Sequence, residues 1–536
     1  MLIFVVILLL AVGFRAFYIS QGIMPKTTDL GHHMYWSKYI VDFSMLPEYG
    51  MPDFIIGEHI IFSAISILSG ASLISTMPVS VLLIVNIFSL LAIFVLTYRF
   101  SELLFNKKDA KQIALFSLLI IGCFYAISSP QSKFVSGGVI GNIIGNLFIP
   151  LAIYSLLQAI KRKDVLFAQL FIIFTVSLAY THHLSTFILL YVLAGVALAG
   201  MVIFLARSKG RLSIFYSNVR SVFLPFFHFH TVITLSLVAL FVFSVHIPSY
   251  LNESAINTAV GTPIKATRTG YTINHIIEKS GPWRMCYAGI AAIIILALVF
   301  FRKPVKIESA KKTLCIVGSS VIIMWAVMIF MMSWKPALLH VDIPSNRVVN
   351  YLTYPLSILS AIGAFVLLKR SREKVSPFLY SIVFLVILGT GFISAYGDFS
   401  DSARTYDKQQ EKKVGQTFLA SKYLNKISSA DENILKDHIY IEGDTWIKLF
   451  FMRGYKYPLS RSFLKRYDDP IKPRETCTRD MIAIPDSETG IKCFESAKVK
   501  YVMLSNGKDT AQFERSANFN KIYASDHVVI FQRRLP

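Results

Sequence analysis

Runs of about 20 mostly apolar residues recur along the chain as far as residue 396, and no other feature constrains the fold as strongly. A helix of that length and composition spans the hydrocarbon core of a bilayer. The chain is 54% hydrophobic and only 16% charged, whereas soluble proteins are about 25% charged. We therefore predict a polytopic α-helical membrane protein with about eleven transmembrane helices. The predicted spans lie near 2–19, 77–98, 111–128, 138–158, 165–181, 186–206, 226–246, 284–301, 313–333, 347–368 and 376–396.

A further apolar stretch at 58–76 opens with Glu58 and His59 and contains several serines. Ionisable residues are costly in hydrocarbon, so we predict that this stretch lies on the membrane surface or re-enters the membrane. The alternative is a twelfth span. A twelfth span would move every later loop to the opposite side of the membrane, against the charge pattern of the loops.

Basic residues separate between alternate loops of the eleven-span arrangement. Twenty Lys and Arg fall in one set of loops, and seven fall in the short loops of the other set. Because Lys and Arg are enriched in cytoplasmic loops, the sequence predicts a cytoplasmic N-terminus and an extracytoplasmic location for everything after about 397. Most of the net charge of +22 is then a topology signal of a cell-membrane protein, and we expect no nucleic-acid partner. The twenty residues are Arg99, Lys107, Lys108, Lys111, Lys161, Arg162, Lys163, Arg207, Lys209, Arg211, Arg220, Arg302, Lys303, Lys306, Lys311, Lys312, Lys369, Arg370, Arg372 and Lys374.

The C-terminal part of the chain has charged residues throughout and lacks a long apolar run. We predict a membrane domain at 1–396, with a first outer loop at 20–76, and an extracytoplasmic soluble α/β domain at 397–536. Apolar spacing within 403–426 predicts a helix, and HIYIEG, KVKYVMLS and HVVIFQRR predict strands. A disulfide between Cys477 and Cys493 would suit an oxidising exterior, and two free thiols are the alternative.

The first outer loop has the densest group of ionisable side chains. TTDLGHHMYW, directly after the first span, contains Asp29, His32 and His33. On a helix, Asp29 would share a face with His32 or His33. A carboxylate here could act as a general base toward an acceptor hydroxyl, or these three residues could hold a divalent metal ion, the one candidate cofactor. The remaining alternative is a loop whose polar residues face water and lipid headgroups.

Three other outer segments could meet this loop in space. His182 and His183 occupy a very short connection between two spans, and Arg347 precedes another span. A guanidinium at headgroup level can bind a phosphate bidentately, so Arg347, His182 and His183 are candidate ligands of a donor phosphate. Contact of Arg347 with ordinary lipid phosphate is the alternative. The glycines of GGVIGNIIGNLF are typical of close helix packing. The candidate residues of a further site are Glu58, His59, His340 and Asp342.

No motif of a soluble enzyme is present, since the sequence lacks a P-loop, a Rossmann glycine fingerprint, a GxSxG elbow and paired CxxC motifs. The ionisable residues lie on the predicted outer face, away from cytosolic nucleotides, so an activated substrate would have to arrive in the membrane. A polyprenyl-phosphate-linked sugar is such a substrate. In layout the chain resembles the GT-C superfamily of integral membrane glycosyltransferases, which includes protein O-mannosyltransferases, lipid A aminoarabinose transferases and oligosaccharyltransferases.

The resemblance implies roles for two residues. In that superfamily an acidic residue just after the first span acts as base or helps to hold a metal, and this position falls on Asp29. A basic residue binds the lipid phosphate, and Arg347 is the candidate. The usual DxD, ExD or DDE motif is replaced by TTDLGHH, and EGDTWIKLFFMRGY lacks the WWDYG sequence of oligosaccharyltransferases. The implied reaction is an inverting transfer of a sugar from a polyprenyl-phosphate carrier to a lipid, glycan or protein acceptor.

Two other functions compete with this interpretation. A transporter or flippase of lipid-linked saccharides would carry ionisable groups near the membrane midplane and often shows repeated halves. Here the ionisable groups gather at one face and the sequence has no repeat. A polysaccharide polymerase or ligase also uses lipid-linked sugars, but such enzymes generally lack a large outer C-terminal domain.

Overall fold

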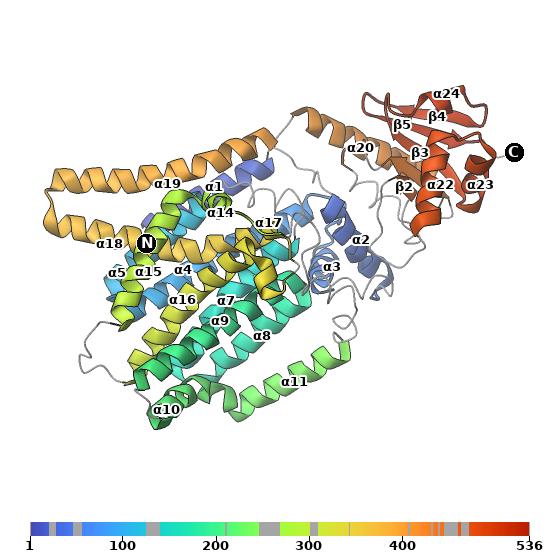
Figure 1. Ribbon diagram of the computed structural model, residues 1–536. Coiled ribbons are helices and arrows are strands. Elements are labelled where there is room, and N and C mark those ends of the chain that lie inside the picture. The colour runs from blue at the N-terminus through green and yellow to red at the C-terminus, as the bar shows by residue number, and fades with distance from the viewer. Residues whose placement is uncertain are drawn as a thin grey trace.

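The computed structural model describes residues 2–20, 28–46, 56–124, 140–208, 212–245, 269–300, 309–341, 343–405, 408–429, 432–437, 440–443, 459–461 and 471–534. A large helical bundle occupies the N-terminal three quarters of the chain, and a small mixed domain follows it (Figure 1). Each of the eleven predicted apolar segments overlaps helix in the part that the structure describes. The helices are α1 Leu2–Ser20, α2 Thr28–Phe43, α3 Gly57–Ser69, α4 Met77–Leu104, α5 Lys107–Leu119, α7 Ile140–Arg162, α8 Val165–Thr181, α9 His183–Ser208, α10 Leu212–Phe223, α11 Phe229–Val245, α14 Ile273–Ser280, α15 Pro282–Phe300, α16 Ser309–Trp334, α17 Ser345–Val348, α18 Thr353–Lys374, α19 Pro377–Thr405 and α20 Lys408–Ile427.

Short non-α segments continue several of these helices. A π-helical turn, η1 (Ile120–Phe124), extends α5. The 3-10 turns η2 (Leu224–Phe227), η4 (Pro336–Leu339) and η5 (Val349–Leu352) occur at bends between helices. The last helix of the bundle, α19, runs through the predicted domain boundary at 396 and ends at Thr405.

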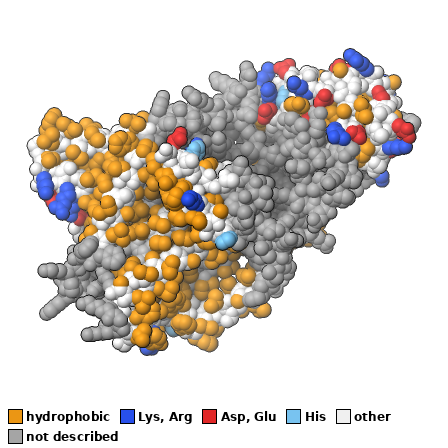
Figure 2. All heavy atoms as spheres, viewed as in Figure 1, with side chains coloured by type: hydrophobic (Ala, Val, Ile, Leu, Met, Phe, Trp, Pro, Cys, Tyr) orange, Lys and Arg blue, Asp and Glu red, His pale blue; other side chains and the backbone are white. Residues whose placement is uncertain are grey.

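The bundle has the surface of a multi-pass membrane protein. Within the described residues, six helices are long and apolar enough to cross a membrane, or seven if the bent pair Phe215–Phe227 and Phe229–Val242 forms one span. Large apolar side chains point outward, as at Leu240, which is 68% exposed. Figure 2 shows hydrophobic side chains over the visible face of the bundle, with Lys and Arg gathered at the edge remote from the C-terminal domain. Such a surface is stable only when lipid covers it.

The helices α2 and α3 lie between the bundle and the C-terminal domain (Figure 1). α3 has 13 residues, which corresponds to about 20 Å of helix, shorter than a bilayer core of about 30 Å. The predicted surface or re-entrant location of 58–76 is therefore compatible with the length of α3. Ser63 on α3 donates a hydrogen bond to the carbonyl oxygen of Ser37 on α2 at 2.9 Å, which ties the two helices together.

The C-terminal domain is built on a five-stranded mixed sheet in the order β2-β1-β3-β5-β4. β1 pairs in parallel with β2 and β3, whereas β5 is antiparallel to β3 and β4. Alternate residues of β3 point to opposite faces, with Val502 in one apolar core and Met503 in the other. α20 covers the second face. The elements after α20 are β1 Asn433–Asp437, β2 Leu459–Arg461, α22 Ile471–Ala483, α23 Glu488–Ser496, β3 Val499–Ser505, α24 Ala511–Arg515, β4 Phe519–Ala524 and β5 Val528–Arg533.

The sequence-based assignments of this domain were correct for three segments and wrong for one. The predicted helix is α20, and KVKYVMLS and HVVIFQRR contain β3 and β5. The strand expected at HIYIEG is wrong for Tyr440–Gly443, which form a turn, whereas positions 438 and 439 lie outside the described residues. The strand β1 ends before this segment, at Asp437. β1 contains Lys436 and Asp437, which are polar yet buried within the sheet. A search for alternating apolar residues therefore did not detect this strand. Cys477 on α22 and Cys493 on α23 form a disulfide with a Cα–Cα distance of 5.4 Å.

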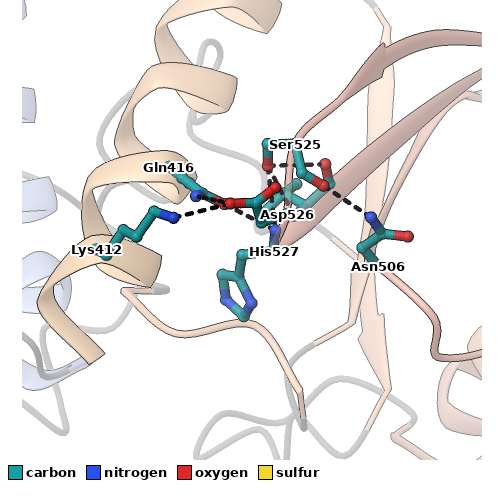
Figure 3. A network of polar contacts seen from close by, with 7 residues as sticks. Lys412, Gln416, Asn506, Ser525, Asp526 and His527 are labelled. Atoms are coloured by element: carbon teal, nitrogen blue, oxygen red, sulfur yellow. Dashed lines mark hydrogen bonds and ion pairs between the residues drawn. The ribbon is translucent and has the colours of Figure 1, made fainter. Parts of the chain in front are cut away.

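Polar contacts fasten α20 to the turn between β4 and β5 (Figure 3). Lys412 forms an ion pair with Asp526 at 2.9 Å, and the backbone N–H of His527 donates to the side-chain oxygen of Gln416 at 2.7 Å. The His527 ring also accepts a hydrogen bond from the backbone N–H of Glu442 through Nε2. α20 is therefore an integral part of the C-terminal domain.

Candidate functional site

Three ionisable side chains from α2 and α3 converge on one point. The Nδ1 atom of His33 lies 2.6 Å from Oε1 of Glu58 and 3.2 Å from Nε2 of His59. The Nε2 atom of His59 lies 3.8 Å from the same carboxylate oxygen. One atom from each residue therefore lies within 4.8 Å of the others, and this trio is the only group of its kind among the described residues. We call it the α2–α3 cluster.

The α2–α3 cluster is shielded from solvent. The side chains of His33, Glu58 and His59 are 18%, 5% and 2% exposed. Burial first, and the neighbouring His33 second, hold the pKa of His59 well below its usual 6.5, so this imidazole is neutral near pH 7. The Oε2 atom of Glu58 is buried and has no hydrogen-bond partner in the described structure. A buried carboxylate oxygen without a partner carries a large desolvation cost.

An apolar core supports the two helices that carry the α2–α3 cluster. Leu30 and Met34 on α2 pack with Phe62 on α3 and with Ile140 on α7 in one core. Val414 of α20 belongs to the same core, so the C-terminal domain packs against the cluster's supporting helices. The site therefore lies where membrane domain and C-terminal domain meet.

The start of α3 is pressed against the end of α8. A Cβ atom added to Gly57 would lie 2.5 Å from the carbonyl oxygen of Tyr180 and 2.9 Å from the methyl group of Thr181. Only glycine allows such a close approach. Because Glu58 follows Gly57 and His182 follows Thr181, this contact brings two predicted site segments side by side.

His182 begins a second polar group, which links α9 to η5. Its Nδ1 atom lies 2.7 Å from the hydroxyl of Ser185, and that hydroxyl lies 2.5 Å from the hydroxyl of Tyr351. Arg347 lies four residues, about one helical turn, before Tyr351 in the chain. Arg347 is partly exposed, on α17. His182, Ser185 and Tyr351 thus form one hydrogen-bonded group, which we call the His182–Tyr351 group.

Two glycines on α7 make room for the His182–Tyr351 group. A Cβ atom on Gly141 would lie 1.9 Å from the ring of His182, and one on Gly145 would lie 1.9 Å from the hydroxyl oxygen of Ser185. The close packing expected from these glycines is therefore present, and it occurs against polar side chains. Asn142 lies between them in sequence, and neither of its side-chain amide atoms has a hydrogen-bond partner in the described parts of the chain.

The structure describes only some of the other predicted site residues. Positions 29, 32 and 33 all lie in the first turns of α2, but the side chains of Asp29 and His32 fall outside the described part of the structure. The same is true of the His183 side chain and of Asp342. His340 is exposed and has a left-handed backbone, with φ of 49°.

Several residues of the site could not be selected from sequence. Ser185 and Tyr351 are common residue types with no distinguishing spacing, and the glycine-rich segment around Asn142 indicated only packing. Arg15 was also missed. Its buried guanidinium donates to the carbonyl oxygens of Gly122 at 2.6 Å and Ile121 at 3.1 Å in η1. A cation within an apolar span was a signal that could have identified it.

Comparison with solved structures identifies proteins of similar fold. No protein-family model and no curated protein sequence matches the chain. Among solved structures, the oligosaccharyltransferase of Archaeoglobus fulgidus in its apo form matches with a TM-score of 0.58 and 15% identity, covering 94% of this chain and 69% of that one. The oligosaccharyltransferase AglB of the same organism, in complex with an inhibitory peptide and a dolichol-phosphate, matches with a TM-score of 0.56, 14% identity and the same coverage.

A bacterial structure matches over almost its whole length. ArnT from Cupriavidus metallidurans bound to undecaprenyl phosphate has a TM-score of 0.58 and 8% identity, covering 98% of this chain and 97% of that one. At such low identity the likeness is one of fold. It confirms the predicted fold, a polytopic helical membrane domain followed by a C-terminal α/β domain.

Proposed function

We propose that this protein is a membrane glycosyltransferase that moves a sugar from a polyprenyl-phosphate carrier to an acceptor on the extracytoplasmic face. The observation that carries the proposal is the contact of Gly57 with Tyr180 and Thr181. In this contact the residue before Glu58 meets the residue before His182, which supports a single site formed by the α2–α3 cluster and the His182–Tyr351 group. Solved structures of two proteins of the same fold contain a dolichol-phosphate or undecaprenyl phosphate, which supports a lipid-phosphate ligand.

In the proposed reaction, Arg347 and His182 bind the donor phosphate. Asp29, on the α2 helix that also presents His33, acts as the general base. It takes the proton of the acceptor hydroxyl while that oxygen forms a bond to the anomeric carbon. The bond between that carbon and the phosphate oxygen breaks, the polyprenyl phosphate leaves, and the configuration is inverted. Polar groups aimed at the developing phosphate charge favour this step more strongly in a site shielded from water.

The C-terminal domain, predicted at 397–536, is assigned to acceptor binding. Its helix α20 reaches the supporting core of the α2–α3 cluster through Val414, so an acceptor held by this domain would be near the proposed base. The acceptor class is a lipid, a glycan or a protein. A divalent metal ion is the candidate cofactor, because the α2–α3 cluster supplies donor atoms for one.

The test is a transfer assay on the full chain in lipid nanodiscs. Radiolabelled monosaccharides linked to undecaprenyl or dolichyl phosphate are supplied together with an extract of cell-envelope acceptors. Asp29→Asn should abolish transfer without changing the elution volume of the protein. Arg347→Ala should raise the KM for the donor by about 10-fold to 100-fold, the effect of losing a charge-assisted hydrogen bond of about 1.5–3 kcal/mol.

Matched variants separate catalytic effects from changes of charge. Glu373→Gln and Arg372→Ala, near the end of α18, each remove an exposed charge, and both should retain full activity. Full transfer by Asp29→Asn would remove it as the base. If the protein moved an intact lipid-linked saccharide across the liposome membrane and transferred no sugar, it would be a flippase instead.

A further inference from the structure

We propose that His33, Glu58 and His59 form a binding site for a divalent transition-metal ion of the zinc class, which cross-links α2 and α3. This inference deepens the proposed function by naming the ion and its ligands, and it rests on that function only for the role of the ion in transfer. The sequence had placed the candidate metal on Asp29, His32 and His33. In the structure, Glu58 and His59 of α3 lie close to His33, whereas the side chains of Asp29 and His32 fall outside its described part.

The geometry of the cluster suits such an ion. Two ligands of a tetrahedral zinc, each about 2.05 Å from the metal, lie about 3.3 Å apart. The imidazole nitrogens of His33 and His59 are 3.2 Å apart. The Glu58 oxygen is 2.6 Å from one nitrogen and 3.8 Å from the other, so a small rotation of the carboxylate would equalise its distances to the two nitrogens.

The burial of the cluster is an independent indication of a ligand. Glu58 is a buried carboxylate whose Oε2 atom has no partner among the residues that the structure describes. Buried charges in proteins are usually paired or coordinate a metal. A divalent cation at this point would compensate the carboxylate charge and accept the lone pairs of both imidazoles.

The donor set distinguishes between ions. Two imidazole nitrogens and one carboxylate oxygen are typical of zinc sites, whereas Mg²⁺ and Ca²⁺ prefer oxygen ligands. Three protein ligands leave one tetrahedral position for water or a substrate oxygen. A metal in that arrangement supplies electrostatic stabilisation of a bound oxygen.

The test measures metal directly and does not depend on transfer activity. The full chain in detergent is stripped with a chelator, loaded with ZnSO₄, desalted and analysed by mass spectrometry for zinc. We expect about one zinc per chain, as for a single preformed site. Glu58→Gln, His59→Ala and His33→Ala should each weaken zinc binding by at least about 100-fold, because loss of a neighbour of a ligand alone costs about 10-fold to 100-fold.

A matched control and a second measurement keep the test decisive if a variant folds poorly. His275→Ala removes a half-buried imidazole from α14 and should bind zinc like the wild type. In the wild type, Co²⁺ should give the visible absorption of a tetrahedral site, and a large excess of MgCl₂ should not displace zinc. Absence of zinc from the wild type, or undiminished zinc in all three cluster variants, would overturn the proposal. Zinc bound by a protein that transfers no sugar would instead contradict the proposed function alone.

Discussion

At the scale of single residues, the site depends on three glycines as well as on its polar side chains. Gly57, Gly141 and Gly145 have no Cβ atom, and each admits another segment to a distance that alanine would forbid. Gly57 brings α3 to the end of α8, and the other two admit His182 and Ser185. From sequence Gly141 and Gly145 were recognisable as packing positions, but their packed partners were not, and nothing in the sequence singled out Gly57.

Asn142 provides a prediction at this scale. Both of its side-chain amide atoms are buried without a partner in the described structure, an arrangement that costs about 1–3 kcal/mol and persists when function requires it. In Asn142→Val, a side chain of similar size, the thermal midpoint should stay the same or rise. The KM for the polyprenyl-phosphate donor should rise about 5-fold to 10-fold, because a hydrogen bond to the ligand of about 1 kcal/mol is lost.

A control for Asn142 lies on the same helix. The Ser155 hydroxyl is also buried without a described partner, but it lies more than three helical turns further along α7. Ser155→Ala should leave the KM for the donor unchanged. Equal kinetics of Asn142→Val and the wild type would show that the amide does not contact the donor.

At the scale of elements, buried polar contacts determine how segments join. In the bundle, Arg15 on α1 binds carbonyl oxygens of the π-helical turn η1, where an irregular ladder leaves backbone acceptors available. In the C-terminal domain, His527 joins β5 to α20 and to the turn at 440–443. The strand β1 was not predicted from sequence, because it contains Lys436 and Asp437. Their polarity is typical of surface residues, yet both are buried.

His527 makes the stability of the C-terminal domain depend on pH. Burial, followed by the positive charge of Lys413, holds the pKa of His527 below 6.5, against a smaller opposite effect of Glu442. The unfolded chain then binds a proton more readily than the folded chain. The full stability is present above about pH 6.5 and decreases as the pH falls from there toward the folded-state pKa.

Hydrogen exchange of the full-length protein measures this effect locally. Protection factors of β3 and β5 amides, corrected for intrinsic exchange, should fall between pH 7.5 and pH 5.5, whereas those of α18 should change little. In His527→Gln the fall should be reduced, because the titrating ring is gone. The same pH dependence in that variant would assign the effect to another group.

At the scale of the whole molecule, the two ends of the bundle differ in chemistry. The turn between α18 and α19 lies at the end remote from the C-terminal domain (Figure 1), and the end of α18 carries Lys369, Arg370, Arg372 and Lys374. The α2–α3 cluster and the C-terminal domain lie at the other end. The positive-inside rule therefore predicts that the site faces the exterior.

Cysteine labelling tests this orientation in intact cells. The three free cysteines, Cys123, Cys286 and Cys315, are replaced by alanine, and one new cysteine is introduced at a time. A membrane-impermeant maleimide should label Lys508→Cys, in an exposed turn of the C-terminal domain, without permeabilisation. Ser376→Cys, between α18 and α19, should react only after permeabilisation. The reverse pattern would place the site in the cytoplasm and exclude the proposed reaction as written.

The sequence by itself determined the class of fold and the positions of the apolar helices. Hydropathy over about 20 residues and apolar periodicity are local properties, so the eleven apolar segments, α20, β3 and β5 were predictable. Only the tertiary structure decided which polar residues meet. Glu58 and His59 reach His33 across some 25 residues of chain, and Tyr351 reaches Ser185 across 166. Such contacts depend on how helices pack, and packing depends on shape complementarity between distant segments, which local patterns do not encode.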